Sequence, residues 1–140
     1  MKVYYKRLVI PTTSRLDEVD ITDHTQHEVQ KSEVQNGMAF IFVPHNGAAL
    51  TINEHQKEIW NDSWRCYQTW APLDGNYEHH RTWGGMEKNG MAHVLSNFMA
   101  KSIPLLILNG RLRLGTWQQL LLWEMDGPRE RQVDVMVMGE

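Results

Sequence analysis

Hydrophobic and polar residues alternate over two stretches near the ends of the chain. The first runs from Val3 to Ile10, and in the second every other residue from Val133 to Val137 is a valine. A period of two is typical of a strand with one face buried. The run Met38 to Val43 contains no polar residue, and this predicts a strand covered on both faces.

Helical spacing appears in three other places. Thr22 or Asp23 can cap a helix that continues to about Gln35 and carries a thin apolar stripe, so we expect it on the surface with His24 and His27 in solvent. Aromatic residues then recur with helical spacing up to Trp70, which can follow a cap at Asn53-Glu54. Such a stripe can serve as a ligand platform, but it is more often a core face, and we favour the core.

The third helix follows a long connection from Pro72 to Lys88 that carries Trp83, Gly84 and Gly85. Loops of this length inside a compact domain are usually functional or disordered, and the aromatic and histidine content argues against disorder. In the helix itself we expect one face to be buried and His93 to lie on the other. The expected buried residues are Val94, Leu95, Phe98 and Met99.

The remainder of the chain alternates between strands and turns. Arg15 to Ile21 and Ala48 to Ile52 are predicted to be short strands, and Asn109-Gly110 is typical of a type I′ hairpin turn between two further strands. Strands from Ile103 onward with helices inserted earlier predict an α+β fold of mostly antiparallel sheet with two or three helices. At 140 residues, we expect a single domain spanning 1–140.

Charge and cysteine content narrow the classes of partner. A net charge of −3, from 14 basic and 17 acidic residues, disfavours nucleic acid and anionic membranes as partners. The start of the chain has no apolar signal segment, so we expect a cytoplasmic protein. Cys66 is the only cysteine, which excludes an internal disulfide and a multi-thiolate zinc site. A bound metal would need imidazole, carboxylate or water ligands.

Candidate chemistry lies first in imidazoles at strand ends, loops and helix starts. His45 follows the apolar run Met38 to Val43, His79 and His80 lie in the long connection, and His93 lies in the first turn of the third helix. Three neutral imidazoles and a water form a site typical of zinc or a similar divalent ion. The alternative is that each histidine binds backbone groups instead.

A second group of candidates is cationic or carries hydroxyl and amide groups. Arginine suits bidentate recognition of phosphate or carboxylate. The alternative is that these arginines form ion pairs with neighbouring carboxylates across strands and bind no ligand. The members of this group are Ser102, Thr116, Gln118, Arg129 and Arg131.

Several segments, taken in order, resemble the YjbQ family of small cytoplasmic proteins. The similarity runs from about Val19 to the C-terminus, and two of the segments are specific in combination: Leu-Gly-Thr-Trp-Gln (114–118) and Asp-Gly-Pro-Arg (126–129). Asn46-Gly47 departs from the two threonines usual in the family, and Met91 stands where a polar residue is usual. The other matching segments are Pro44-His45, Ala48 to Glu54, Tyr77 to His79 and Asn89 to His93.

The resemblance implies an α+β homotrimer with secondary thiamine-phosphate synthase activity. That reaction joins a pyrimidine diphosphate to a thiazole phosphate and releases pyrophosphate, so the expected partner is a small phosphorylated metabolite. The resemblance implies a divalent metal ion, zinc or magnesium/manganese, with His45, His79 and His93 as ligands, although His80 could replace His79. It also implies Glu54 and Arg129 as catalytic residues and Ser102, Thr116 and Gln118 as substrate-binding residues. A trimer that binds a metal or anionic metabolite without catalysis is the alternative.

Overall fold

The structure is a computed structural model that describes residues 1–82 and 87–140. Trp83, Gly84 and Gly85 of the long connection lie outside the described residues. The strands are β1 (Lys2–Pro11), β2 (Asp17–Asp20), β3 (Gly37–Phe42), β4 (Ala48–Asn53), β5 (Ser102–Leu108), β6 (Arg111–Leu112), β7 (Gln119–Glu124) and β8 (Glu130–Gly139). The helices are α1 (Thr22–Ser32), α2 (Lys57–Trp70), the 3₁₀ turn η1 (Glu78–Arg81) and α3 (Gly90–Ser96).

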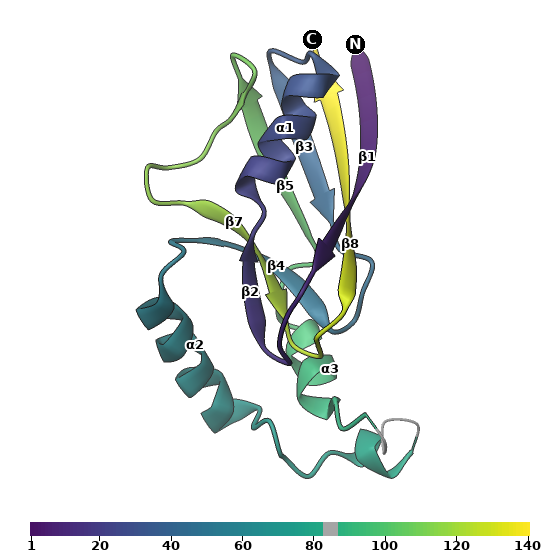
Figure 1. Ribbon diagram of the computed structural model, residues 1–140, viewed down its shortest axis with the longest axis vertical. Coiled ribbons are helices and arrows are strands. Elements are labelled where there is room, and N and C mark those ends of the chain that lie inside the picture. Colours follow the sequence, from purple (N-terminus) through teal and green to yellow (C-terminus); the bar gives the residue numbers. More distant parts are fainter. Residues whose placement is uncertain (83–86) are drawn as a thin grey trace.

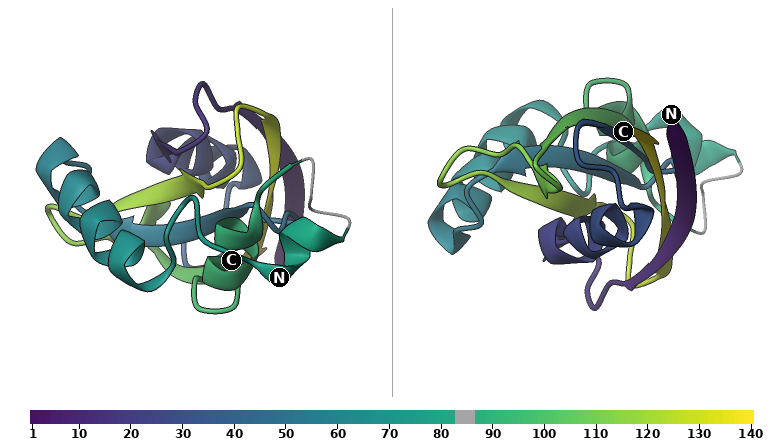
Figure 2. Two further views of the ribbon diagram at one scale, coloured as in Figure 1. Left: turned by 90° about the horizontal axis from the view of Figure 1, so that it is seen from below. Right: turned by 90° about the horizontal axis from the view of Figure 1, so that it is seen from above.

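Two antiparallel sheets form the frame of the molecule (Figure 1), and together with the helices they confirm the predicted α+β class. The larger sheet has the order β1-β8-β3-β5-β6, and the smaller has the order β2-β7-β4. Because β1 pairs with β8 over their full lengths, from Lys2↔Gly139 to Pro11↔Glu130, the two termini lie side by side. Views along the long axis show α1 and α2 on opposite sides of the smaller sheet (Figure 2).

The smaller sheet is buried on both faces. One face, with Leu50 and Leu122, packs with α1 and the inner face of the larger sheet into the main hydrophobic core. The other face, with Leu121 and Trp123, packs against α2 and α3. Trp60, Trp64 and Tyr67 of α2 surround Trp123 with ring centroids 4.7, 5.3 and 5.9 Å from it, so the aromatic stripe is core as predicted.

The strand predicted to be covered on both faces, 38–43, is not. In β3, Ala39 and Ile41 are fully buried, but Phe40 and Phe42 point out of the larger sheet and are each 40% exposed. The strand that is buried on both faces is β7, from Leu120 to Glu124. An apolar run therefore identified a strand correctly but did not reveal that its outer face lies open in a single chain.

Three helical predictions also need correction. Helix α1 ends at Ser32, three residues before the predicted Gln35, because Glu33 adopts φ 60°. Helix α2 begins at Lys57, so Asn53-Glu54 does not cap it. Phe98, predicted to be buried, lies beyond α3 and is 71% exposed. His24 and His27 are exposed as expected.

The hairpin prediction at Asn109-Gly110 is confirmed. Both residues have positive φ, 53° and 72°, as a type I′ turn requires. Strand β6 after the turn is only two residues long, because the chain leaves the sheet edge before it reaches β7. No helix within the described ranges combines the length and apolar character needed to cross a lipid bilayer.

Candidate functional site

A pocket of about 510 Å³ lies where the loop before β4, helix α3 and the β7–β8 turn meet. Its walls include five residues singled out from the sequence: His45, His79, His93, Arg129 and Arg131. The pairing of Ala48 with Glu124 brings these segments together, because it places the loop before β4 beside the turn after β7. The remaining lining residues are Asn46, Gly47, Glu87, Asn89, Ala92 and Asp126.

His45 is held by the main chain of β8. Its Nε2 accepts a hydrogen bond of 2.9 Å from the amide of Gln132. Burial and the positive charge of Arg131 lower the pKa of His45, so the ring is neutral near pH 7. A neutral imidazole that accepts through Nε2 carries its proton on Nδ1. His45 could therefore bind a metal only after giving up this hydrogen bond.

The other two predicted ligands contact each other with their rings tilted by 60°. The rings of His79, in η1, and His93, in α3, have centroids 4.5 Å apart. The alternative ligand His80 has another role, since its Nε2 accepts a 2.9 Å hydrogen bond from the amide of Gly90 at the start of α3. His79 rather than His80 thus faces the pocket.

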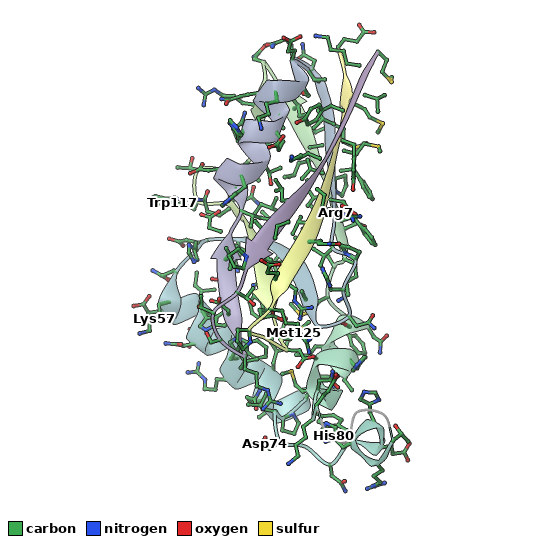
Figure 3. The ribbon with its side chains drawn as sticks, turned by 45° about the vertical axis from the view of Figure 1, so that its right-hand side comes forward. Arg7, Lys57, Asp74, His80, Trp117 and Met125 are labelled. Atoms are coloured by element: carbon green, nitrogen blue, oxygen red, sulfur yellow. The ribbon has the colours of Figure 1, made fainter. Side chains whose placement is uncertain are left out.

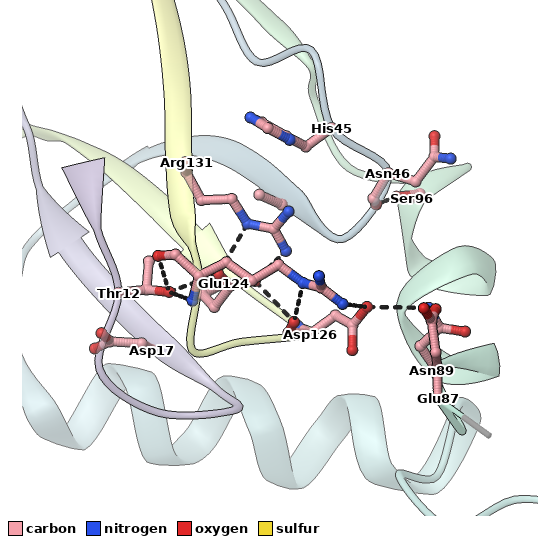
Figure 4. A network of polar contacts seen from close by, with 12 residues as sticks. Thr12, Asp17, His45, Asn46, Glu87, Asn89, Ser96, Glu124, Asp126 and Arg131 are labelled. Carbon is pink, nitrogen blue, oxygen red and sulfur yellow. Dashed lines mark hydrogen bonds and ion pairs between the residues drawn. The ribbon is translucent and has the colours of Figure 1, made fainter. Parts of the chain in front are cut away.

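A buried ion pair forms one wall of the pocket (Figure 4). Arg131, 5% exposed, donates from Nε and from a terminal nitrogen to the two oxygens of Glu124, which is 0% exposed, over 2.8 and 2.5 Å. The hydroxyl of Thr12 donates to the same carboxylate at 2.7 Å. Gly47 allows this arrangement, because a Cβ there would lie 2.8 Å from Arg131 and 2.9 Å from Asp126.

The second arginine of the pocket is half exposed. Arg129 donates to the backbone carbonyl of Asp126 at 2.8 Å and to its carboxylate at 3.2 Å. The same carboxylate oxygen accepts from the side-chain amide of Asn89 at 3.0 Å, and this side-chain amide also donates to Glu87 at 3.0 Å. The guanidinium is therefore oriented toward the pocket rim but remains accessible.

These residues do not form a ready three-ligand metal site. Over residues 1–82 and 87–140, no three or more His, Cys, Asp or Glu side chains are grouped closely enough to hold an ion. With His45 bound to Gln132, the three-imidazole arrangement expected from the sequence does not fit the geometry.

The other predicted site residues lie elsewhere. Glu54 and Thr116 line a different cavity of about 370 Å³ at the far end of β4. Gln118 lies beside them, where its side chain accepts from the amide of Gly115 at 2.8 Å. Ser102 pairs with Phe42 on the larger sheet and is exposed. Of the eight site residues that the family resemblance implies, a single chain thus brings four into one pocket.

Sequence reasoning missed Lys101, which holds the pocket loop in place. Its ammonium donates to the carbonyl oxygens of Asn46 (3.0 Å) and Ala48 and to the hydroxyl of Ser96 (2.7 Å). Burial and the charge of Arg131 lower the pKa of Lys101 to about 8. A lysine next to a strand gives no local signal of such a role.

The lowered pKa of Lys101 predicts a pH dependence of stability. Between pH 8 and 10.5 the unfolded chain holds a proton on this lysine that the folded chain has lost. The Lys101 contribution to the free energy of unfolding should therefore rise with pH in this window. Urea denaturation of wild type and Lys101→Gln at pH 7.5, 9 and 10 measures it, because other groups titrate alike in both proteins. Parallel pH curves for the two proteins would contradict the prediction.

The chain is similar to known proteins over almost its whole length. The family profile described as "UPF0047 protein YjbQ-like" matches residues 6–140. The chain belongs to this family. Among UPF0047 proteins, YugU of Bacillus subtilis is 36% identical over 96% of this chain and 98% of its own length. A UPF0047 protein of Methanothermobacter thermautotrophicus is 30% identical over 100% of this chain and 95% of its own.

Solved structures of YjbQ-like proteins share the fold. A protein of unknown function from Sulfolobus solfataricus superposes with a TM-score of 0.91 at 33% identity and covers 99% of both chains. An uncharacterised family member from Clostridium acetobutylicum gives a TM-score of 0.86 at 34% identity, over 95% of this chain and 99% of its own. The relatives' names specify no activity, so function must be argued from the site.

Proposed function

We propose that the His45 pocket binds a phosphorylated small molecule and supports the transfer expected from the sequence, in which a pyrimidine diphosphate is joined to a thiazole phosphate and pyrophosphate leaves. The observation that carries this proposal is the presence of His79, His93 and Arg129 in one pocket beside the buried Arg131. As the bond to the diphosphate breaks, negative charge accumulates on the leaving group. Arg129 would donate to that charge, and His79 and His93 would donate further hydrogen bonds.

The balance of charge in the pocket supports a divalent cation as a companion of the substrate. Arg129 and Arg131 face three carboxylates, those of Glu87, Glu124 and Asp126. Magnesium is typically held by one or two carboxylates together with substrate phosphates, so it needs no three-ligand protein site. Asp126 and Glu87 would hold the ion, and the ion would supply neutralisation of phosphate charge.

A pyrophosphate-release assay with His93→Ala tests the proposed activity. Wild-type protein, given both phosphorylated substrates and magnesium, should release pyrophosphate. The variant should be about 10- to 100-fold slower, as expected for loss of a hydrogen bond to a charged group. His24→Ala, which removes an exposed histidine from α1, is the matched control and should leave the rate unchanged.

Absence of pyrophosphate from wild type, with and without magnesium, would overturn the proposed activity. Calorimetric titration of the thiazole phosphate into the same protein then tests the alternative of a binding protein without catalysis.

The exposed thiol of Cys66 is in keeping with the reducing cytoplasm as the proposed compartment.

We further propose that copies of this chain cover the outer face of the larger sheet in the homotrimer expected from the sequence. This face carries Val3, Tyr5, Phe40, Leu106 and Met136, whose exposed fractions run from 38% at Met136 to 63% at Val3. Arg7 of β1, which alternation places on the same face, is labelled in Figure 3. Contiguous apolar patches of this kind are typical of protein interfaces. Because the amide of Gln132 on β8 binds His45, the face borders the pocket. A second copy would therefore lie beside the site.

Replacement of Phe40 by glutamate should dissociate the trimer. A charge at the centre of an apolar interface is left without solvent or partner, which costs several kcal/mol. Light scattering coupled to size-exclusion chromatography should give the mass of three chains for wild type and of one for Phe40→Glu. Trp70→Glu changes an exposed aromatic residue on α2 instead and should remain trimeric. A monomeric wild type would refute the proposal.

A further inference from the structure

A second cleft, of about 500 Å³, lies between the loop after β1, strand β2 and the start of α2. It shares no lining residue with the His45 pocket. No residue of this cleft was singled out in the sequence as a site. Its walls are made by Ser14, Leu16, Asp17, Glu18, His55, Lys57 and Trp60.

Glu18 is the unusual group in this cleft. Its side chain is only 10% exposed, and within the described residues its carboxylate accepts no hydrogen bond of ordinary geometry; its ion-pair neighbour is His55, whose Nε2 lies 3.8 Å from one carboxylate oxygen. Burial raises the pKa of Glu18, and the neighbouring His55 and the indole N–H of Trp123 lower it only in part. In the described part of the chain, the Trp123 indole N–H itself has no hydrogen-bond partner. Neither neighbouring donor completes a hydrogen bond to the Glu18 carboxylate in the described structure, so its oxygens can still accept from a ligand.

The neighbouring carboxylate, that of Asp17, differs from that of Glu18 because it accepts several hydrogen bonds. Asp17 accepts hydrogen bonds from the amide and hydroxyl of Thr13, at 2.9 and 3.2 Å, and from the amide of Glu18 at 2.9 Å. Its lone pairs are therefore used locally. Lys57 also lines the cleft, but over residues 1–82 and 87–140 the ion pair of Glu18 is with His55 and not with Lys57.

Trp60 is the aromatic residue of the cleft wall, and two other indole rings pack against it. Trp60 packs edge-to-face on Trp123, with ring centroids 4.7 Å apart at 61°, and on Trp64 at 5.4 Å and 81°. Glu18 lies directly opposite Trp123 across the β2–β7 pair, so the carboxylate and the Trp60 wall are held by the same residue. A flat aromatic surface beside a carboxylate favours a planar organic cation, through cation–π and charge-assisted hydrogen bonds.

We propose that this cleft is a binding site for a planar organic cation with N–H donors, such as an amidinium or guanidinium group on an apolar body. The N–H groups donate to Glu18, and the planar part lies against Trp60. His55, which is 3.8 Å from Glu18 and 3.9 Å from Asp20, closes one end. The site is independent of the chemistry proposed for the His45 pocket.

Titration with benzamidine, followed by calorimetry, tests the site. Wild type should bind benzamidine and should bind neither benzamide, its neutral counterpart, nor benzoate. Glu18→Gln removes the charge with little change in shape and should weaken benzamidine binding at least tenfold. Asp62→Asn removes a charge from the exposed face of α2 and should leave the affinity unchanged.

A blocking variant guards against a folding defect in Glu18→Gln. Ser14→Arg places a guanidinium on an exposed loop at the cleft, where it can pair with Glu18 and exclude the probe. It should also weaken benzamidine binding at least tenfold. The proposal is overturned if wild type does not bind benzamidine, if benzamide binds equally well, or if both variants retain the wild-type affinity.

Discussion

Replacing Glu124 by alanine should lower the free energy of unfolding by about 3–5 kcal/mol, the usual cost of leaving one member of a buried ion pair behind. Arg131 would lose both of its carboxylate contacts, and Thr12 would lose its 2.7 Å acceptor. The amide of Asp126, which donates to Glu124 at 3.1 Å, would lose its partner as well. Urea denaturation at a fixed protein concentration measures the loss.

Two control experiments test whether the loss of stability comes from the unpaired charge of Arg131. Asp62→Ala breaks an exposed ion pair with Arg65 of 2.7 Å and should cost less than about 1 kcal/mol. Replacing both buried partners, Glu124 by leucine and Arg131 by methionine, should restore most of the stability, because no charge is then left unpaired. If Glu124→Ala costs no more than Asp62→Ala, the pair does not support the fold in the way its burial indicates.

Arg129→Gln should reduce pyrophosphate release about 100- to 1,000-fold, comparable to the loss of one donor that stabilises charge in a transition state. The guanidinium is half exposed at the pocket rim and is held by the carbonyl and carboxylate of Asp126, so it is positioned before substrate arrives. Glutamine keeps a hydrogen-bond donor but has no charge. Steady-state rates with both phosphorylated substrates give the measurement.

The effect should be specific to this arginine and to its shape. Arg113→Gln removes another exposed guanidinium, one that donates to the carbonyl of Leu114 at 2.9 Å, and should leave the rate unchanged. Arg129→Lys keeps the charge and loses the planar fork, so an intermediate rate is expected. A rate for Arg129→Gln within a factor of two of wild type would remove Arg129 from the proposed chemistry.

The elements that could be predicted are those whose signal is local. Alternation fixed β1 and β8, and positive φ at Asn109-Gly110 followed from the residue types alone. The apolar run of β3 predicted the strand correctly and its burial wrongly, because Phe40 and Phe42 point to the outer face of the larger sheet, where the described residues leave them 40% exposed. Sequence periodicity reports which residues prefer burial and does not say what covers them.

The pocket could be predicted only in part, because it depends on long-range strand pairing. His45 and Arg129 are neighbours since β4 pairs with β7, a register that no local pattern specifies. Glu124 left a usable signal, as a charged residue that directly follows the apolar run Leu120 to Trp123. Lys101 left none, because its role depends on carbonyls of a distant segment. Asn89 lies in a segment that resembles the family, but its contact with Asp126 could not be predicted from the local sequence.

The length of β4 has a consequence for inhibitors. Its first residue, Ala48, adjoins the His45 pocket, while Glu54 follows its last residue, Asn53, and lines the cavity beside Thr116. An extended strand rises about 3.4 Å per residue, so roughly 20 Å separate the two ends. A drug-sized compound that fills the His45 pocket will therefore leave Glu54 of the same chain untouched. A bisubstrate analogue that engages both Glu54 and the His45 pocket of one chain must therefore span roughly 20 Å.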